Sequence, residues 1–228
     1  MIPVPRNEYQ AALDDLRADV VGMGELVLTR LDDALAALTD GDEAAARAVV
    51  DGDDDVNERY LALESDCLDL FALQQPVAGD LRFVAASFKV LTDIERVGDL
   101  AANLASYALD TDDDRVSDVD LGGIGAAARD LFADALDAYA DGDAAACHRL
   151  AERDDEVDAL CQQAGERIVR DLVEQGAGGD GPWDVEAVLD DVSRLLLAVR
   201  DLERVADHGV NVAARTLYDV ESDPELVY

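Results

Sequence analysis

The sequence predicts an all-α protein that contains two copies of a three-helix unit, six long helices in all. Apolar residues recur at spacings of three and four along most of the 228-residue chain, as they do in amphipathic helices. Ala and Leu, both strong helix formers, are abundant, and only five prolines and sixteen glycines interrupt them. The stretch DIERVGDLAANLA at 93–105 also begins again at 201–213 as DLERVADHGVNVA, with seven of thirteen positions identical.

In the first copy, glycine- and proline-containing turns separate three helices. The apolar pattern over 13–38 predicts one long helix, which the segment TDGDEAA ends at Gly41. A second helix is expected from there to about Phe71. The segment QQPVAGD then turns the chain, and Pro76 suits the first turn of a third helix that continues to about Leu109.

The second copy follows the same scheme after a polar stretch without apolar periodicity. A helix is expected from Leu121 to Tyr139, and the segment ADGDAAA ends it as TDGDEAA did. The next helix runs to about Glu174, the glycine-rich segment QGAGGDGPWD turns the chain, and the last helix reaches about Tyr218. Short loops favour antiparallel neighbours in a bundle. The expected organisation is a first repeat at 1–110, a linker at 111–120 and a second repeat at 121–228.

Acidic residues dominate the charge of the chain, with 53 Asp and Glu against 18 Lys and Arg and a net charge of −35. Such a surface repels nucleic acid, so no nucleic-acid partner is expected. The excess favours a halophilic surface adapted to molar salt, where the Debye length is about 3 Å and self-repulsion is weak. The alternative is an acidic patch for cations or for a basic partner.

Two further features predict a cytoplasmic protein. The first ten residues lack the apolar segment of a signal peptide, and no apolar run is long enough for direct membrane insertion. The cysteines show no C-x-x-C spacing, which favours reduced, packed thiols over disulfides or zinc ligation. They are Cys67, Cys147 and Cys161.

Each copy of the repeated stretch carries two carboxylates one helical turn apart, Glu95 with Asp99 and Glu203 with Asp207. Both pairs continue the apolar stripe of their helix and are expected to face inward rather than to the opposite, polar face. A buried carboxylate is costly unless it is paired or binds a cation, and two of them one turn apart repel each other. These acids therefore require compensation.

The second helices carry a matching pair of acidic motifs, DDDVN at 53–57 and DDEVD at 154–158. In each copy this motif and the repeated stretch lie about equally far from the turn between their helices. Antiparallel packing would bring both motifs to one height. The expected clusters are Asp53, Asn57, Glu95 and Asp99 in the first copy, and Asp154, Asp158, Glu203 and Asp207 in the second.

Clusters of oxygen ligands suit hard cations such as Mg²⁺, Ca²⁺, Mn²⁺ or ferric iron. Alternatively, Arg96, Arg204 or other arginines neutralise the same acids on a wet surface. Neither His148 nor His208 belongs to the Glu-x-x-His motif of ferritin-like di-iron sites, and the DGD turns lack the glycine and closing glutamate of an EF-hand. No glycine-rich phosphate loop is present, so ATP hydrolysis is not expected.

Residues 74–105, QQPVAGDLRFVAASFKVLTDIERVGDLAANLA, resemble the PhoU family of phosphate-uptake regulators, whose helical signature couples a QP–DLR start to an ERxGD core. VRDLERVADHGVNVA resembles the equivalent signature of the second PhoU repeat, and VVDGDDDVN and AERDDEVD look like its second-helix motifs. The resemblance covers nearly the whole chain in order. It departs at GPWDVEA, which stands where the second copy would repeat the QP–DLR start.

This resemblance implies two three-helix bundles related by a pseudo-twofold axis. It also implies multinuclear sites for divalent or ferric metal ions (iron, manganese, magnesium or zinc) at Glu/Asp-x-x-x-Asp motifs. The matching motifs pair Glu95 with Asp99, Glu203 with Asp207, and Asp154 with Asp158. The counterpart Asp53-x-x-x-Asn57 ends in an uncharged amide, so the first site is expected to be the weaker one.

The resemblance further implies a non-catalytic cytoplasmic adaptor, peripheral to the inner face of the membrane. Its expected partner is the ATPase subunit of the phosphate ABC transporter, through which it would negatively control phosphate uptake. A sensor kinase or transcription regulator is expected as a second partner, and the chain is expected to form a homodimer. Two other classes stay open, a carboxylate-bridged metalloenzyme and a purely structural helical adaptor whose acids are salt-bridged.

Overall fold

The computed structural model of the chain describes residues 6–73, 78–109, 119–176, 182–222 and 226. These residues form seven helices and no strand, so the predicted all-α class is confirmed. The helices are α1 (Arg6–Asp40), α2 (Glu43–Asp51), α3 (Asp53–Leu73), α4 (Ala78–Leu109), α5 (Leu121–Asp141), α6 (Ala144–Gly176) and α7 (Pro182–Glu221).

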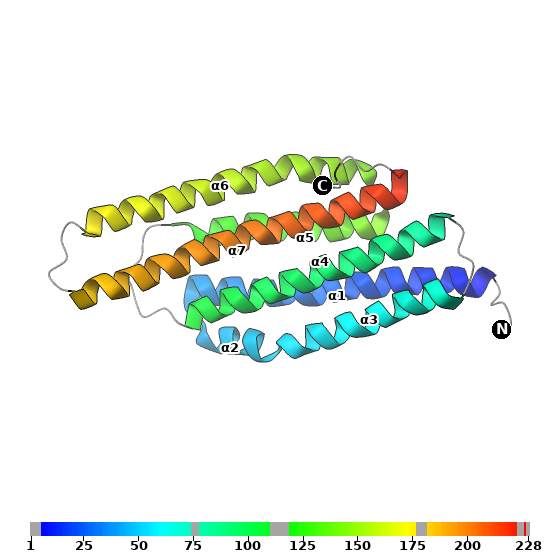
Figure 1. The fold of residues 1–228 in the computed structure, drawn as a ribbon, viewed down its shortest axis with the longest axis horizontal. Coiled ribbons are helices and arrows are strands. Elements are labelled where there is room, and N and C mark those ends of the chain that lie inside the picture. Colours follow the sequence, from blue (N-terminus) through cyan, green and yellow to red (C-terminus); the bar gives the residue numbers. More distant parts are fainter. Residues whose placement is uncertain (1–5, 74–77, 110–118, 177–181, 223–225, 227–228) are drawn as a thin grey trace.

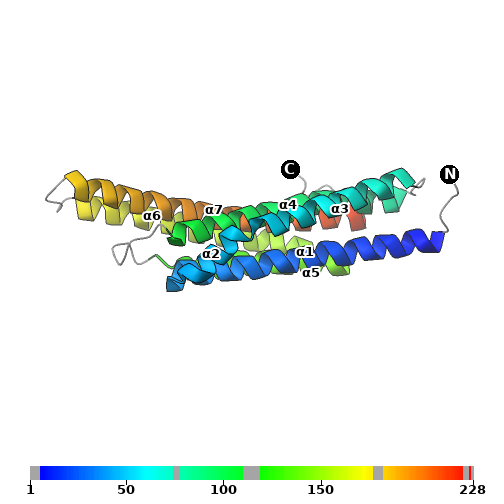
Figure 2. The ribbon, with the colours of Figure 1, turned by 90° about the horizontal axis from the view of Figure 1, so that it is seen from below.

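The helices form two layers. α6, α7, α4 and α3 lie side by side in one layer (Figure 1), and α1 and α5 back them in the other (Figure 2). α4 runs antiparallel to α7, and α1 runs antiparallel to α5. A rotation about an axis between α4 and α7 therefore relates the first repeat to the second, as the pseudo-twofold expectation requires.

Glycines end the first helix of each repeat at equivalent positions. Gly41 and Gly142 have φ angles of 69° and 64°, in the left-handed region that glycine adopts without strain. Asp42 then caps α2, because its Oδ1 accepts hydrogen bonds from the amides of Ala44 and Ala45 at 3.0 and 3.1 Å. The helix breaks predicted at both DGD segments are confirmed.

The prediction of one continuous second helix in the first repeat is wrong, because Gly52 divides it into α2 and α3. A Cβ at Gly52 would lie 3.0 Å from both terminal nitrogens of Arg30, so a larger residue would displace this guanidinium. Arg30 also forms an ion pair of 3.1 Å with Asp55. In the second repeat Arg153 stands at the equivalent position, and α6 is continuous.

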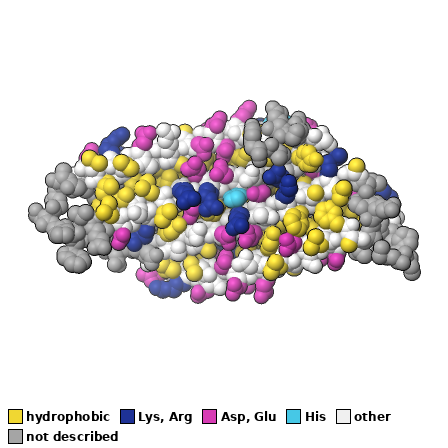
Figure 3. Space-filling model, in the orientation of Figure 1, with side chains coloured by type: hydrophobic (Ala, Val, Ile, Leu, Met, Phe, Trp, Pro, Cys, Tyr) yellow, Lys and Arg dark blue, Asp and Glu magenta, His cyan; other side chains and the backbone are white. Residues whose placement is uncertain are grey.

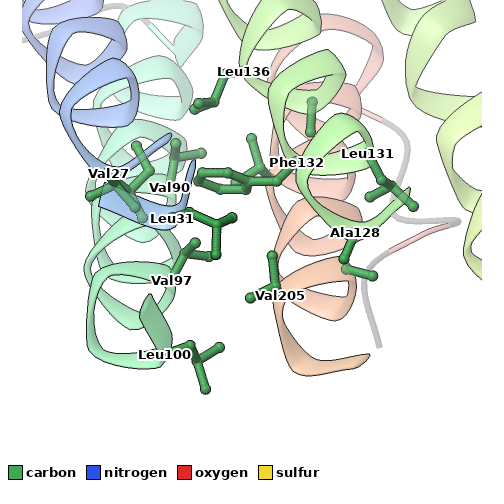
Figure 4. Packing of buried hydrophobic residues seen from close by; sticks show 14 of the residues in the cluster. Val27, Leu31, Val90, Val97, Leu100, Ala128, Leu131, Phe132, Leu136 and Val205 are labelled. Atoms are coloured by element: carbon green, nitrogen blue, oxygen red, sulfur yellow. The ribbon is translucent and has the colours of Figure 1, made fainter. Parts of the chain in front are cut away.

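One hydrophobic core runs through both repeats. Phe132 of α5 points toward Leu31 of α1 and Val90 of α4 (Figure 4), and all three side chains are fully buried. Full burial of a large apolar side chain contributes about 1.5–3 kcal/mol. The two three-helix repeats thus share a core rather than holding one each.

Polar groups reinforce this junction at one end. The hydroxyls of Ser87 in α4 and Tyr139 in α5 lie 2.7 Å apart. Nη1 of Arg17 in α1 donates to the carbonyl of Tyr139 at 2.8 Å, and its guanidinium lies 4.5 Å from the ring centre of Phe83. The cation over an aromatic face adds to the apolar packing.

Some expectations concern residues outside the described ranges, namely Pro76, the linker up to 118, the second hairpin turn at 177–181 and most of the tail. Among the helices that the structure describes, none combines the length and the apolarity that crossing a bilayer would require.

Gly209 lets α7 approach α5 closely. A Cβ there would lie 2.5 Å from Cδ2 of Leu131 and 3.2 Å from Cα of Phe132, whereas a Cβ at Gly165 in α6 meets no atom within 4 Å. We expect Gly209→Ala to lower the free energy of unfolding by about 1–3 kcal/mol through overpacking. Gly165→Ala should raise it by about 0.5–1 kcal/mol through helix propensity. Denaturant titration of both variants at one ionic strength measures the difference, and equal effects would contradict a tight α5–α7 contact.

Candidate functional site

The first cluster, Asp53, Asn57, Glu95 and Asp99, lies between α3 and α4 at one height. Nδ2 of Asn57 donates to Oδ2 of Asp53 at 3.2 Å. Burial raises the pKa of Glu95; the Asp99 and Asp53 carboxylates raise it further, and Arg96 lowers it. The hairpin therefore brings together the four side chains that the spacing selected.

Arg96 neutralises part of the first cluster. Its Nη1 lies 3.2 Å from Oδ2 of Asp99, and its Nε lies 3.6 Å from Oε2 of Glu95. Because Asn57 carries no charge, the first cluster contains three carboxylates, and two of them pair with this guanidinium. The salt-bridged alternative thus describes the first cluster in part.

The second cluster, Asp154, Asp158, Glu203 and Asp207, lies between α6 and α7. The pKa of Asp154 is raised to about 6, chiefly by burial and then by the charges of Asp158, Asp207, Asp155 and Glu203. Burial, followed by Asp158, also raises the pKa of both Glu203 and Asp207. Four carboxylates therefore repel one another where they are partly shielded from water.

Compensation is weaker in this second cluster. His208 and Arg204 lower the pKa of Asp207, and Arg200 lowers that of Glu203. Nη1 of Arg204, the counterpart of Arg96, nevertheless lies 3.5 Å from Oδ1 of Asp201, which is not a cluster residue. Oδ1 of Asp154 is buried and has no hydrogen-bond partner within the described ranges. A buried acceptor without a partner is costly. The second cluster fits a bound cation on this ground.

The acids lie at the margin of the apolar stripe of each helix. They are therefore less deeply buried than the expectation that they face inward requires. The side chain of Glu95 is 18% exposed and that of Asp99 is 38% exposed, while Asp158 and Asp207 are both exposed. Water at the margin reduces the cost of ionisation that a core position would impose.

In the part of the chain that the structure describes, no three His, Cys, Asp or Glu side chains converge closely enough to hold a metal ion as they stand. A cation would have to draw the carboxylates together.

His208 could, from its position beside Asp207, either support that carboxylate or be exposed, and in the structure it connects α7 to α4 beside the clusters. Nδ1 of His208 lies 2.9 Å from Oδ1 of Asp93, and both side chains are largely buried. His208 lowers the pKa of Glu95 in the first cluster and of Asp207 in the second. The only sequence signal was the position of His208 beside Asp207. Its partner depends on how α4 crosses α7, which spacing within one helix does not report.

The second cluster also lies over a thiol. Cys161 is buried one turn after Asp158, and burial raises its pKa to about 12, with Glu203 as the largest charged contribution. Tyr60 stands at the equivalent position of the first repeat. All three cysteines are free and buried, so the predicted packed thiols are confirmed.

Comparison with known proteins links both repeats to one family. The PhoU domain matches residues 20–108 and 121–216, one match in each repeat. The chain is 31% identical over 215 residues to the phosphate-specific transport system accessory protein PhoU homolog of Pseudomonas aeruginosa, covering 93% of this chain and 85% of that protein. It is 30% identical over 217 residues to the phosphate-specific transport system accessory protein PhoU of Escherichia coli K12, with 94% and 86% covered.

Solved structures agree with this match. The crystal structure of PhoU from Pseudomonas aeruginosa superposes with a TM-score of 0.85 at 30% identity, covering 94% of this chain and 100% of that chain. The phosphate transport system regulatory protein PhoU from Streptococcus pneumoniae superposes with a TM-score of 0.84 at 26% identity, covering 94% and 98%. The sequence motifs, the two-layer helical fold and these matches together show that the chain belongs to the PhoU domain family.

Proposed function

We propose that this chain is an accessory protein of a phosphate-specific transport system and negatively regulates phosphate uptake without catalysis of its own. The observation that carries the proposal is the match of both repeats to the PhoU domain, since relatives over nearly the whole chain are named for phosphate-specific transport. Its partner is the ATPase subunit of the phosphate ABC transporter, which holds it at the inner face of the membrane. A sensor kinase or transcription regulator is the second partner, and the chain forms a homodimer.

Deleting the gene should increase phosphate uptake by cells grown at high phosphate, because restraint on the transporter is lost. Initial rates of radiolabelled phosphate uptake measure this, and returning the wild-type chain should restore the low rate. The ATPase subunit should co-purify with the tagged chain at the salt concentration of the cell. Unchanged uptake, together with absence of the ATPase subunit from the purified complex, would contradict the proposal.

The second cluster is the stronger of two cation sites. Asp154 and Asp158 on α6 would hold the cation together with Glu203 and Asp207 on α7, and the buried Oδ1 of Asp154, which has no hydrogen-bond partner within the described ranges, supports a ligand role. When bound, the cation supplies the positive charge that allows four neighbouring carboxylates to stay ionised. Oxygen ligands favour hard cations such as ferric iron, manganese or magnesium over soft metal ions. Zinc also binds carboxylates, and carboxylates that bridge two ions can hold more than one.

Removing carboxylates should weaken cation binding unequally in the two repeats. The double variant E203Q/D207N should bind Mn²⁺ at least about tenfold more weakly than the wild type, since charge-assisted contacts are among the strongest polar ones. The double variant E95Q/D99N should lose less affinity for Mn²⁺, because Arg96 already compensates the charge of those carboxylates. Calorimetry and elemental analysis measure both, with the exposed Glu156→Gln on α6 as control. Equal losses of affinity in the two double variants would contradict the ranking of the two sites. If the wild type contained no metal after soaking in iron or manganese, the proposal of cation sites would be wrong.

Cation-free stability should depend on the ionisation of Asp154. Folding raises the pKa of this carboxyl from 3.8 to about 6, so the folded chain binds the proton more tightly and loses stability as the pH rises through this window. Asp154→Asn should therefore raise Tm above pH 6 and change it little near pH 4. Glu156→Gln removes the same charge from an exposed position and should show no such dependence. A Tm gain from Asp154→Asn that does not vary with pH would contradict this account.

A further inference from the structure

Two basic side chains stand apart from the others along the line where α4 and α7 pack side by side, here called the α4–α7 seam. Acidic and basic side chains both gather along the middle of the outer face of the four-helix layer (Figure 3). Arg96 and Arg204 form ion pairs with carboxylates of their own helix. Lys89 of α4 and Arg215 of α7 differ, because neither forms an ion pair within 4.0 Å with any residue that the structure describes.

Two contacts between α4 and α7 fix the register of the seam. Nδ1 of His208 lies 2.9 Å from Oδ1 of Asp93, and Tyr107 donates a hydrogen bond of 3.0 Å to Asp201. In an antiparallel pair, these contacts place the crossing of the two helices near Gly98 of α4 and its repeat counterpart on α7, 108 residues later. The height of any other residue in the seam follows from its distance to this crossing.

Lys89 and Arg215 lie at one height in the seam. Lys89 stands nine residues before the crossing in α4, and Arg215 stands nine residues after it in α7. Both distances correspond to about 14 Å at 1.5 Å per residue. Lys89 is one turn before Asp93 and Arg215 is two turns after His208, so each lies on the face of its helix that meets the other helix. The two cations therefore oppose each other across the seam.

Two acids flank the opposed cations, Asp93 one turn away on α4 and Asp219 one turn away on α7. Neither carboxylate lies within 4.0 Å of either opposed cation. Asp93 is held by the histidine contact. Burial raises the pKa of Asp219, and the guanidinium groups of Arg17 and Arg82 lower it. Both acids thus have other cations beside them, and the opposed pair has no carboxylate of its own.

Arg215 also has an unmet hydrogen-bonding requirement. Its Nε is buried and has no hydrogen-bond partner among the residues that the structure describes. A buried donor without a partner is costly, and two like charges at close range repel each other. An anion between the two cations removes both costs at once.

The internal repeat does not require this pair. In the other half of the seam, the counterparts of Lys89 and Arg215 are the uncharged Leu197 and Tyr107. Lys89 is moreover the only lysine in the chain. An ammonium group is a compact point charge on a flexible stem, whereas a guanidinium is a flat fork that binds two oxygens at once. One group of each kind suits a tetrahedral oxyanion better than a planar carboxylate, which the fork alone satisfies.

We propose that Lys89 and Arg215 bind a phosphate ion across the α4–α7 seam, with the guanidinium on two of its oxygens and the ammonium on a third. Hydrogen phosphate carries an O–H group that a flanking carboxylate, Asp93 or Asp219, accepts, and sulfate has no such donor. Bound phosphate bridges the two repeats, because Lys89 belongs to the first and Arg215 to the second. The inference rests on the proposed function and deepens it, since phosphate itself becomes the signal that the accessory protein reads.

Calorimetric titration of the full chain with inorganic phosphate should show one site per chain. Metal ions are first removed with a chelator, so that phosphate cannot bind through a cation in the carboxylate clusters, and chloride is held constant. Lys89→Gln and Arg215→Gln should each weaken binding by about tenfold or more, because each removes a charge-assisted contact. Lys89→Arg keeps the charge and should lose less than Lys89→Gln. The matched control is Arg170→Gln, which removes an exposed arginine of α6 and should change nothing.

The single lysine allows the site to be observed directly. Reductive methylation with ¹³C-formaldehyde labels Lys89 and the amino terminus and keeps the positive charge of both. Phosphate should shift the lysine methyl resonance with the affinity that calorimetry measures. Lys89→Arg lacks this resonance and therefore assigns it.

Several results would overturn the proposal. They are absence of phosphate binding, wild-type affinity in K89Q/R215Q, and a Lys89 resonance that does not move at saturating phosphate. Sulfate that binds as tightly as phosphate would overturn phosphate as the ligand. Because Lys89 is exposed, Lys89→Gln keeps the test decisive if Arg215→Gln lowers Tm. All of these measurements use the purified chain alone, so their failure leaves the accessory role standing, and phosphate uptake and co-purification decide that role separately.

Discussion

The packing of α4 against α7 holds the two repeats together and determines where every functional side chain lies. Both helices sit at the centre of the four-helix layer, and both also pack against the backing helices, α4 on α1 and α7 on α5. Among the described helices, α3 and α6 contact elements of their own repeat alone, and each packs most extensively against its member of the central pair. A shift in the α4–α7 contact would therefore move both carboxylate clusters at once.

The four-helix layer also explains why the fold accommodates the acids of the two clusters. A partly buried position between a central and a flanking helix is drier than open surface and wetter than the core, so a carboxylate there keeps some hydration while it interacts strongly with its charged neighbours. The repeats use this position differently. The first offsets its charge with Arg96 and Asn57, whereas the second places four carboxylates over a buried thiol.

Much of this arrangement could be predicted from spacing alone. Helical periodicity and the DGD turns located the helices, and the equal distances of the acidic motifs from each hairpin turn selected the residues of both clusters. Other features depend on distant residues. The break at Gly52 accompanies Arg30, which arrives from α1, and the partner of His208 arrives from α4 of the other repeat. The depth of the acids was overestimated because a helical stripe has a margin that periodicity does not resolve.

The break at Gly52 has an electrostatic consequence. Asp53 is the first residue of α3, with Asp54 and Asp55 in the same first turn, and the free amides of a helix N-terminus act as about half a positive charge. Asp154 lies well inside the continuous α6 and receives no such field. One copy of the duplicated motif thus carries part of its counter-charge in its own backbone, while the other depends on the side chains of Arg200, Arg204 and His208.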